Sequence, residues 1–289
     1  MTTLKDLVAA ELAQSVDPRI TEIAATIAAQ HGTAAQAVLF YGSCLRESQL
    51  DGLMLDFYLI VSDYNMAYPK QWLATANRLI PPNVFPFAYN GLAAKYAVLS
   101  VDDFAALNRP EASTVSVWAR FAQPTRLVWA RDNAAQQNAL AAVAQAVPTL
   151  FALASPIADG KDDLSVWRAG FAQTYRAELR AERTDRSGSI VDSDPDRYRT
   201  FGALVSARSP MTKMLAERRW KQLQRHGKWM SVARLAKASL TFAGGIDYLA
   251  WKINRHAGTA IVIKPWQRKW PLLGAVVLVP RLFFKGAVR

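Results

Sequence analysis

Cysteine and histidine are scarce in this sequence. Cys44 is the only cysteine among 289 residues, so no intramolecular disulfide can form, which is typical of proteins in a reducing compartment. The three histidines, His31, His226 and His256, share no metal-ligand spacing, and we therefore expect no zinc site.

Long apolar runs are also missing. No stretch of 18 apolar residues occurs, so we expect no transmembrane helix. The longest candidate, Trp270–Val279, is short and is followed by Pro280. The first twenty residues carry acids and lack the apolar centre of a signal peptide, and they are not Arg-rich like a transit peptide. These features predict a cytoplasmic protein.

Acidic residues are nearly absent from the last third of the chain. Residues 206–289 contain 17 Lys and Arg against Glu217 and Asp247, a net charge of +15, whereas residues 1–205 carry a net charge of −3. A nearly neutral body with a strongly basic end predicts an anionic partner for that end, either nucleic acid or an anionic membrane.

The order of predicted elements indicates an α/β (α+β) fold with a mixed sheet. We expect a nucleotide-handling α/β domain over 1–131, a mainly helical domain over 132–240, and a basic, aromatic, amphipathic segment over 241–289. Apolar spacing, turn residues and breakers predict the following elements: helices in 3–31 broken at Asp17-Pro18, strands 37–41 and 54–61, helix 69–80, a hairpin of 84–89 and 93–100 around Asn90-Gly91, strand 125–130, then helices interrupted by a polar loop over 184–197.

The stretch 37–63 carries the strongest indication of chemistry. Its first strand ends in Gly42-Ser43, and its second, MLDFYLIV, is an apolar run that contains one carboxylate, Asp56. A charge inside a hydrophobic strand costs several kcal/mol unless a partner or a metal ion compensates it. We therefore expect either a partner group or a metal ion beside Asp56.

Four segments of the chain resemble one family. YGSCLRES, MLDFYLIVSD, KYAVLS and WARFAQPTRLVW are similar, in order and character, to segments of the mitochondrial-type, peripheral phosphatidate cytidylyltransferases, which are CDP-diacylglycerol synthases with the polymerase-β-type nucleotidyltransferase fold. The resemblance covers roughly residues 37–130. It implies transfer of CMP from CTP to phosphatidate, with release of pyrophosphate.

The resemblance also implies a set of site residues. Gly42 and Ser43 would meet the nucleotide phosphates, with Arg46 beside them, while Asp56 and Lys95 would be catalytic. Met54 stands where related nucleotidyltransferases have the first acid of Asp-x-Asp, so Asp51 or Asp63 would join Asp56 in holding Mg²⁺. Each residue also has an ordinary structural interpretation: a turn for Gly42-Ser43 and Asp51, a helix cap for Asp63, a buried ion pair or cap for Asp56, and an exposed edge position for Lys95.

The basic C-terminal region has three interpretations. It is a solvated helical face, a nucleic-acid site, or an interfacial segment whose Trp and Phe residues lie at the headgroups while its bases meet anionic lipid. The apolar runs 258–263 and 270–284 favour lipid. We expect CTP, phosphatidate and an anionic membrane as partners, no nucleic acid, and a location on the inner face of the cell membrane. The alternatives are a nucleotidyltransferase for RNA, protein or small molecules, and a catalytically degenerate membrane scaffold.

Overall fold

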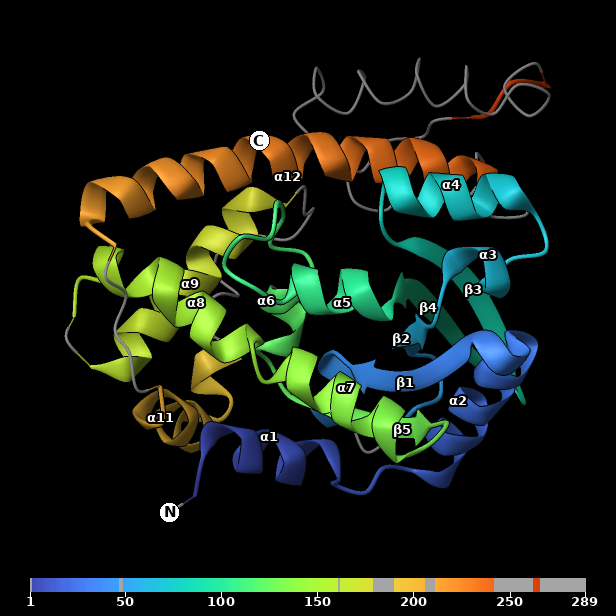
Figure 1. Ribbon diagram of the computed structural model, residues 1–289, viewed down its shortest axis with the longest axis horizontal. Coiled ribbons are helices and arrows are strands. Elements are labelled where there is room, and N and C mark those ends of the chain that lie inside the picture. The colour runs from blue at the N-terminus through green and yellow to red at the C-terminus, as the bar shows by residue number, and fades with distance from the viewer. Residues whose placement is uncertain are drawn as a thin grey trace.

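The computed structural model describes residues 2–46, 49–160, 162–178, 190–205, 211–241 and 262–265. Its centre is a five-stranded sheet in the order β3-β4-β2-β1-β5 (Figure 1). The pair β2·β4 is parallel and the other three pairs are antiparallel. The predicted α/β class with a mixed sheet is confirmed. The strands are β1 (Ala35–Tyr41), β2 (Met54–Val61), β3 (Asn83–Tyr89), β4 (Leu92–Ser100) and β5 (Thr125–Ala130).

The hairpin between β3 and β4 forms where the sequence predicts it. Asn90 and Gly91 both have positive φ, at 47° and 81°, as a two-residue hairpin turn requires. Pro86 has no N–H to donate, and β3 is accordingly an edge strand. Strand β3 therefore forms its ladder hydrogen bonds with β4 on one side, and its other side lies at the edge of the sheet.

One face of the sheet is covered by helices from the first third of the chain. They are α2 (Pro18–Gln30), α3 (Tyr64–Ala67) and α4 (Gln71–Leu79). The helix break predicted at Asp17-Pro18 is confirmed: α2 begins there, with Asp17 as its cap and Pro18 in its first turn. Ile23 and Ile27 of α2 pack with Phe40 and Phe57 of the sheet. The apolar cluster on this face consists of residues between positions 16 and 129.

The other face packs against a larger group of helices. They are α1 (Leu4–Leu12), α5 (Val101–Leu107), α6 (Trp118–Phe121), α7 (Asn133–Val143) and α8 (Ala146–Ala154), with α9 (Asp163–Ala177), α11 (Pro195–Ala203) and α12 (Lys213–Thr241) beyond them. One apolar cluster joins Leu39 and Tyr58 of the sheet to Trp167 of α9 and Trp220 of α12. The core is therefore continuous across residue 131, and the division at that position stays a prediction.

Helix α12 runs along one side of the molecule (Figure 1) and packs on α9, α8 and β3. Gly227 permits this approach, because a Cβ at that position would overlap the carbonyl oxygen of Ala177.

The polar loop expected over 184–197 ends earlier than predicted: residues 190–192 are helical, and after a turn Asp194 caps α11. Asp194-Pro195 is the same cap-and-proline signal that starts α2.

Residues Asn133–Ile157 are apolar and long enough to cross a membrane by length and composition alone, and 61% of the most apolar 18-residue stretch among them is buried inside the protein.

The predicted docking tail over 241–289 lies outside the described residues except for Thr241 and residues 262–265. Its aromatic residues Trp251, Trp266, Trp270, Phe283 and Phe284 are all among those outside.

Candidate functional site

A row of polar side chains crosses the sheet on the face that meets the later helices. Tyr41 of β1 is the register partner of Asp56 on β2, and Asp56 is the partner of Lys95 on β4. Register partners point to the same face of a sheet. Pairing between sequence-distant strands thus brings together Asp56 and Lys95, two of the residues predicted from sequence.

The group that compensates the charge of Asp56 in the structure is Lys95. Its Nζ lies 3.1 Å from Asp56 Oδ1, and the side chains are 40% and 25% exposed. Oδ1 itself is buried and has no hydrogen bond of good geometry, so the contact is an ion pair whose acceptor capacity is incompletely used. A buried carboxylate oxygen of this kind can accept a further ligand.

The turn after β1 lies against this carboxylate. Gly42 has φ +100°, and a Cβ built there would be 3.5 Å from Asp56 Oδ2. Glycine adopts this φ without steric cost, so the chain can turn directly beside the carboxylate. Leu45 N–H closes the turn by donating to the carbonyl of Gly42. Gly42 is therefore at the Asp56–Lys95 pair.

Ser43 and Arg46 are the ends of the short 3₁₀ helix η2 (Ser43–Arg46). Ser43 is exposed, and Cys44 is buried with its thiol donating to the carbonyl of Met54 at the start of β2. This bond ties the turn to the strand that carries Asp56. Cys44 is thus a packed residue, and the turn backbone has a fixed place beside the site.

Asp63 is at the other end of β2 from Asp56. Seven residues of extended chain at ~3.3 Å each separate the two carboxylates by roughly 20 Å. Asp63 caps α3 by accepting from Asn65 N–H at 2.7 Å, and it pairs with Arg78 at 3.4 Å. The backbone hydrogen bond from Asn65, with a smaller effect of Arg78, lowers the pKa of Asp63. Its structural role as a cap explains its position.

Asp51 also makes its contact elsewhere. Its exposed carboxylate lies 3.9 Å from the guanidinium of Arg19, at the start of α2, the helix on the other face of the sheet. In the part of the chain that the structure describes, no three His, Cys, Asp or Glu side chains form a group that could hold a metal ion. Asp56 fits Mg²⁺ as a single protein ligand, because its Oδ1 is buried and under-used; Asp51 and Asp63 do not fit.

Two arginines that the sequence analysis left out lie on the same side of the sheet. Arg120 of α6 donates to the carbonyl of Ser116 and pairs with Glu178 at 3.2 Å. Arg234 of α12 donates through Nη2 to the hydroxyl of Ser116 at 3.1 Å. Ser116 therefore joins the two guanidinium groups.

The phenol of Tyr58 connects these arginines to Asp56. Tyr58 follows Asp56 by two positions on β2 and so shares its face. Burial raises its pKa, and the charges of Arg120, Arg234, Glu178 and Asp56 all act on it. Burial lowers the pKa of Arg120, but Glu178 together with the phenols of Tyr58 and Tyr41 reverses this effect and raises it. The arginines and the carboxylate thus share one electrostatic environment.

A third base holds the segment between α4 and β3. Lys237 of α12 is buried, and its Nζ donates to the carbonyls of Ile80 and Pro82, while Arg234 Nε donates to the carbonyl of Pro81 at 2.7 Å. Burial, with the nearby charge of Arg234, lowers the pKa of Lys237 to about 7. These two bases fix α12 to the start of β3, beside the strand that carries Lys95.

The sequence contained partial signals for these residues. Arg120 lies within the segment WARFAQPTRLVW, which carries part of the family resemblance. Arg234 and Lys237 follow Trp220 and Leu223 by fourteen residues each, close to four helical turns, so they lie on the same buried face of α12. No local sequence pattern indicated that Glu178 would belong to this group, because its partner Arg120 is 58 positions away in the chain.

Comparison with known proteins adds little. No family model and no curated protein matches the chain. Among solved structures, the crystal structure of a nucleotidyltransferase-like protein from Exiguobacterium sibiricum 255-15 is similar over 92% of both chains, with 13% sequence identity and a TM-score of 0.28. A similarity this weak cannot indicate an activity, so function has to be argued from the site itself.

Proposed function

We propose that this protein is a nucleotidyltransferase that transfers CMP from CTP to phosphatidate. The observation that carries the proposal is the Asp56–Lys95 ion pair beside the turn at Gly42, in the middle of a mixed sheet. The four segments that resemble phosphatidate cytidylyltransferases support the choice of substrates, and three of them contain these residues.

In the proposed reaction a phosphate oxygen of phosphatidate attacks the α-phosphorus of CTP. The bond from the α-phosphorus to the bridging oxygen breaks, and pyrophosphate leaves. A phosphate monoester has a second pKa near ~6 and is largely ionised at neutral pH, so no general base is obligatory. This agrees with the position of His31, which faces away from the site and bonds to Ala67 and Tyr96 on the opposite side of the sheet.

Alignment and charge neutralisation then remain as the tasks of the site. The backbone at Gly42 and Ser43 would hold nucleotide phosphates through its amides. Lys95 would turn from Asp56 to the triphosphate and offset charge that develops on it. Bound Mg²⁺ supplies neutralisation of phosphate charge, and Asp56 is the carboxylate that would hold it.

Arg120 and Arg234 are the groups we assign to the phosphate of the acceptor. A guanidinium group presents several N–H donors in a plane and suits phosphate oxygens. The charges of both arginines and of Asp56 act on the buried phenol of Tyr58, and Asp56 shares the sheet face of Tyr58, so an anion held there would lie on the side of the sheet where the nucleotide is placed. The acceptor lipid lies in a bilayer, which implies a cytoplasmic protein acting at the inner face of the cell membrane.

Two other functions fit parts of the molecule. A nucleotidyltransferase acting on RNA, protein or a small molecule would use the same sheet site. A catalytically degenerate membrane scaffold would explain Met54 in place of an acid. Labelled CTP and Mg²⁺ incubated in parallel with phosphatidate vesicles, with RNA, and with a cell extract that supplies proteins and small molecules separate the three. Labelled CDP-diacylglycerol is the expected product; labelled RNA, protein or small molecule would indicate the first alternative, and the absence of any transfer the second.

A further inference from the structure

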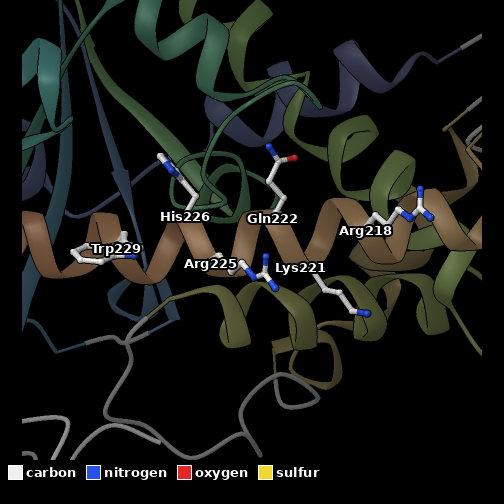
Figure 2. Close-up of a pocket in the computed structure, with 6 residues that line it drawn as sticks. All are labelled: Arg218, Lys221, Gln222, Arg225, His226 and Trp229. Carbon is white, nitrogen blue, oxygen red and sulfur yellow. The ribbon is translucent and has the colours of Figure 1, made fainter.

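Helix α12 presents a basic stripe to solvent on the side away from the core. At 3.6 residues per turn, Met214, Arg218, Arg225 and Trp229 fall within about 60° of one another. Ala216, Trp220, Leu223 and Gly227 are buried on the opposite face. We define the stripe by the six residues that line an open hollow of about 480 Å³, all from α12 (Figure 2): Arg218, Lys221, Gln222, Arg225, His226 and Trp229.

We infer that this stripe docks the protein on an anionic membrane surface. Charge is the first reason: Glu217 is the one acid in the sequence of α12, whereas the stripe carries three bases. These bases are distinct from Arg234 and Lys237, which are bonded to carbonyls on the buried side. A solvent-facing row of bases without matching acids attracts anionic headgroups.

Exposed apolar side chains at both ends of the stripe are the second reason. Trp229 is 75% exposed, and Met214 and Leu215 at the other end are 58% and 49% exposed. Fifteen residues at ~1.5 Å each place Met214 and Trp229 about 22 Å apart along the helix. Tryptophan is favoured at the headgroup level of a bilayer, and bases with apolar neighbours are typical of helices that lie in the interface. Nucleic acid would gain from the bases but not from Met214 and Leu215.

This inference rests on the proposed function in one respect: an acceptor that lies in a membrane is the reason why the protein would need a docking surface. The docking itself needs no turnover. Binding to lipid vesicles in the absence of CTP therefore tests the stripe alone, and labelled product formation tests the activity alone. Failure of one leaves the other measurable.

The test uses the full chain in vesicle sedimentation. We expect binding to vesicles of phosphatidylcholine with one third phosphatidylglycerol, weak binding to phosphatidylcholine alone, and weakening with salt. The variant Arg218→Gln/Lys221→Gln/Arg225→Gln should bind the anionic vesicles at least about tenfold more weakly. The matched control, Lys5→Gln/Arg131→Gln/Arg199→Gln, removes the same charge from exposed positions on other elements and should change binding less than twofold.

A second variant keeps the bases. Trp229→Ser should leave the dependence on salt unchanged and weaken binding several-fold, because it removes the interfacial aromatic side chain alone. All variants keep the basic segment after α12, so differences in binding between them come from the stripe.

Equal losses of vesicle binding in both triple variants would show that net charge acts without a docking face. Unchanged vesicle binding, with loss of binding to a single-stranded RNA oligonucleotide, would assign the stripe to nucleic acid. Either result overturns the inference.

Discussion

Lys95 and Asp56 are register partners on parallel strands, and the Lys95 ammonium lies 3.1 Å from the Asp56 carboxylate. Both side chains are partly open to solvent, and ion pairs of this kind contribute at most about 1 kcal/mol to stability. The pair is therefore weak enough for an incoming triphosphate to separate. Lys95 can then meet phosphate while Asp56 Oδ1 becomes free to accept a cation.

Replacing Asp56 should abolish nucleotide transfer without unfolding the protein. Asp56→Asn keeps the shape and removes the charge, leaving Lys95 with access to water, so we expect a change in stability below about 1 kcal/mol. Turnover with CTP, phosphatidate and Mg²⁺ should fall at least about a hundredfold. Near-normal turnover in a folded variant would remove Asp56 from the site.

Asp63 provides the matched comparison, because it was predicted as a metal ligand and serves as a cap of α3. Asp63→Ala removes the bond to Asn65 and should lower the free energy of unfolding by about 1 kcal/mol, with turnover within about threefold of wild type at a temperature where both are folded. Thermal denaturation and the transfer assay together check this. A loss of turnover equal to that of Asp56→Asn would return Asp63 to the metal site.

A side chain at Gly42 should impair CTP binding more than stability. In Gly42→Ala the new methyl group has room, at 3.5 Å from Asp56 Oδ2, but φ +100° is strained for alanine and costs of order 1–3 kcal/mol. Gly91→Ala is the control, since Gly91 has φ +81° in open space. We expect similar losses of stability in both variants and a loss of CTP affinity, measured by calorimetry, in Gly42→Ala alone.

The sheet and its turns were predictable because each had a local signal. Asp17-Pro18 marks the start of α2, Asn90-Gly91 marks a hairpin, and Pro86 marks an edge strand. Such features depend on neighbouring residues, and the local sequence specifies them.

The partners of the polar side chains were less predictable. Asp56 and Lys95 are 39 positions apart and meet because β4 lies beside β2. No local sequence pattern predicts that these two strands are neighbours. The same holds for Arg120 with Glu178, and for Lys237 with the carbonyl of Ile80, 157 positions away. The basic character of α12 was visible, but its division into a buried face and a solvent stripe depends on what packs against it.

Stability should rise with pH above neutrality because of Lys237. Its pKa in the folded protein is about 7, below the ordinary value of 10.5, so between these values the unfolded chain retains a proton that the folded chain has lost. Stability therefore increases as pH rises through this window. The neutral amine can still donate to both carbonyls. Denaturant unfolding at pH 7 and 9 should show a gain of about 1–2 kcal/mol in wild type relative to Lys237→Met; parallel pH profiles would contradict it.

Arg234 should determine the affinity for the acceptor. If its guanidinium holds the phosphate of phosphatidate, Arg234→Gln raises KM for a short-chain phosphatidate about tenfold or more and leaves KM for CTP within twofold. Arg234→Lys keeps the charge and should recover part of the loss.

Arg219 separates binding of the acceptor from support of the fold. It lies on the same helix and likewise donates to backbone carbonyls, those of Pro110 and Ala112, but it is fifteen residues, or about 22 Å, from Arg234. Arg219→Gln should therefore reduce stability as much as Arg234→Gln while leaving both KM values unchanged. If Arg234→Gln instead raised the two KM values equally, or if Arg219→Gln reproduced its effect, Arg234 would be a structural support of α12, and the acceptor phosphate would have to be bound elsewhere.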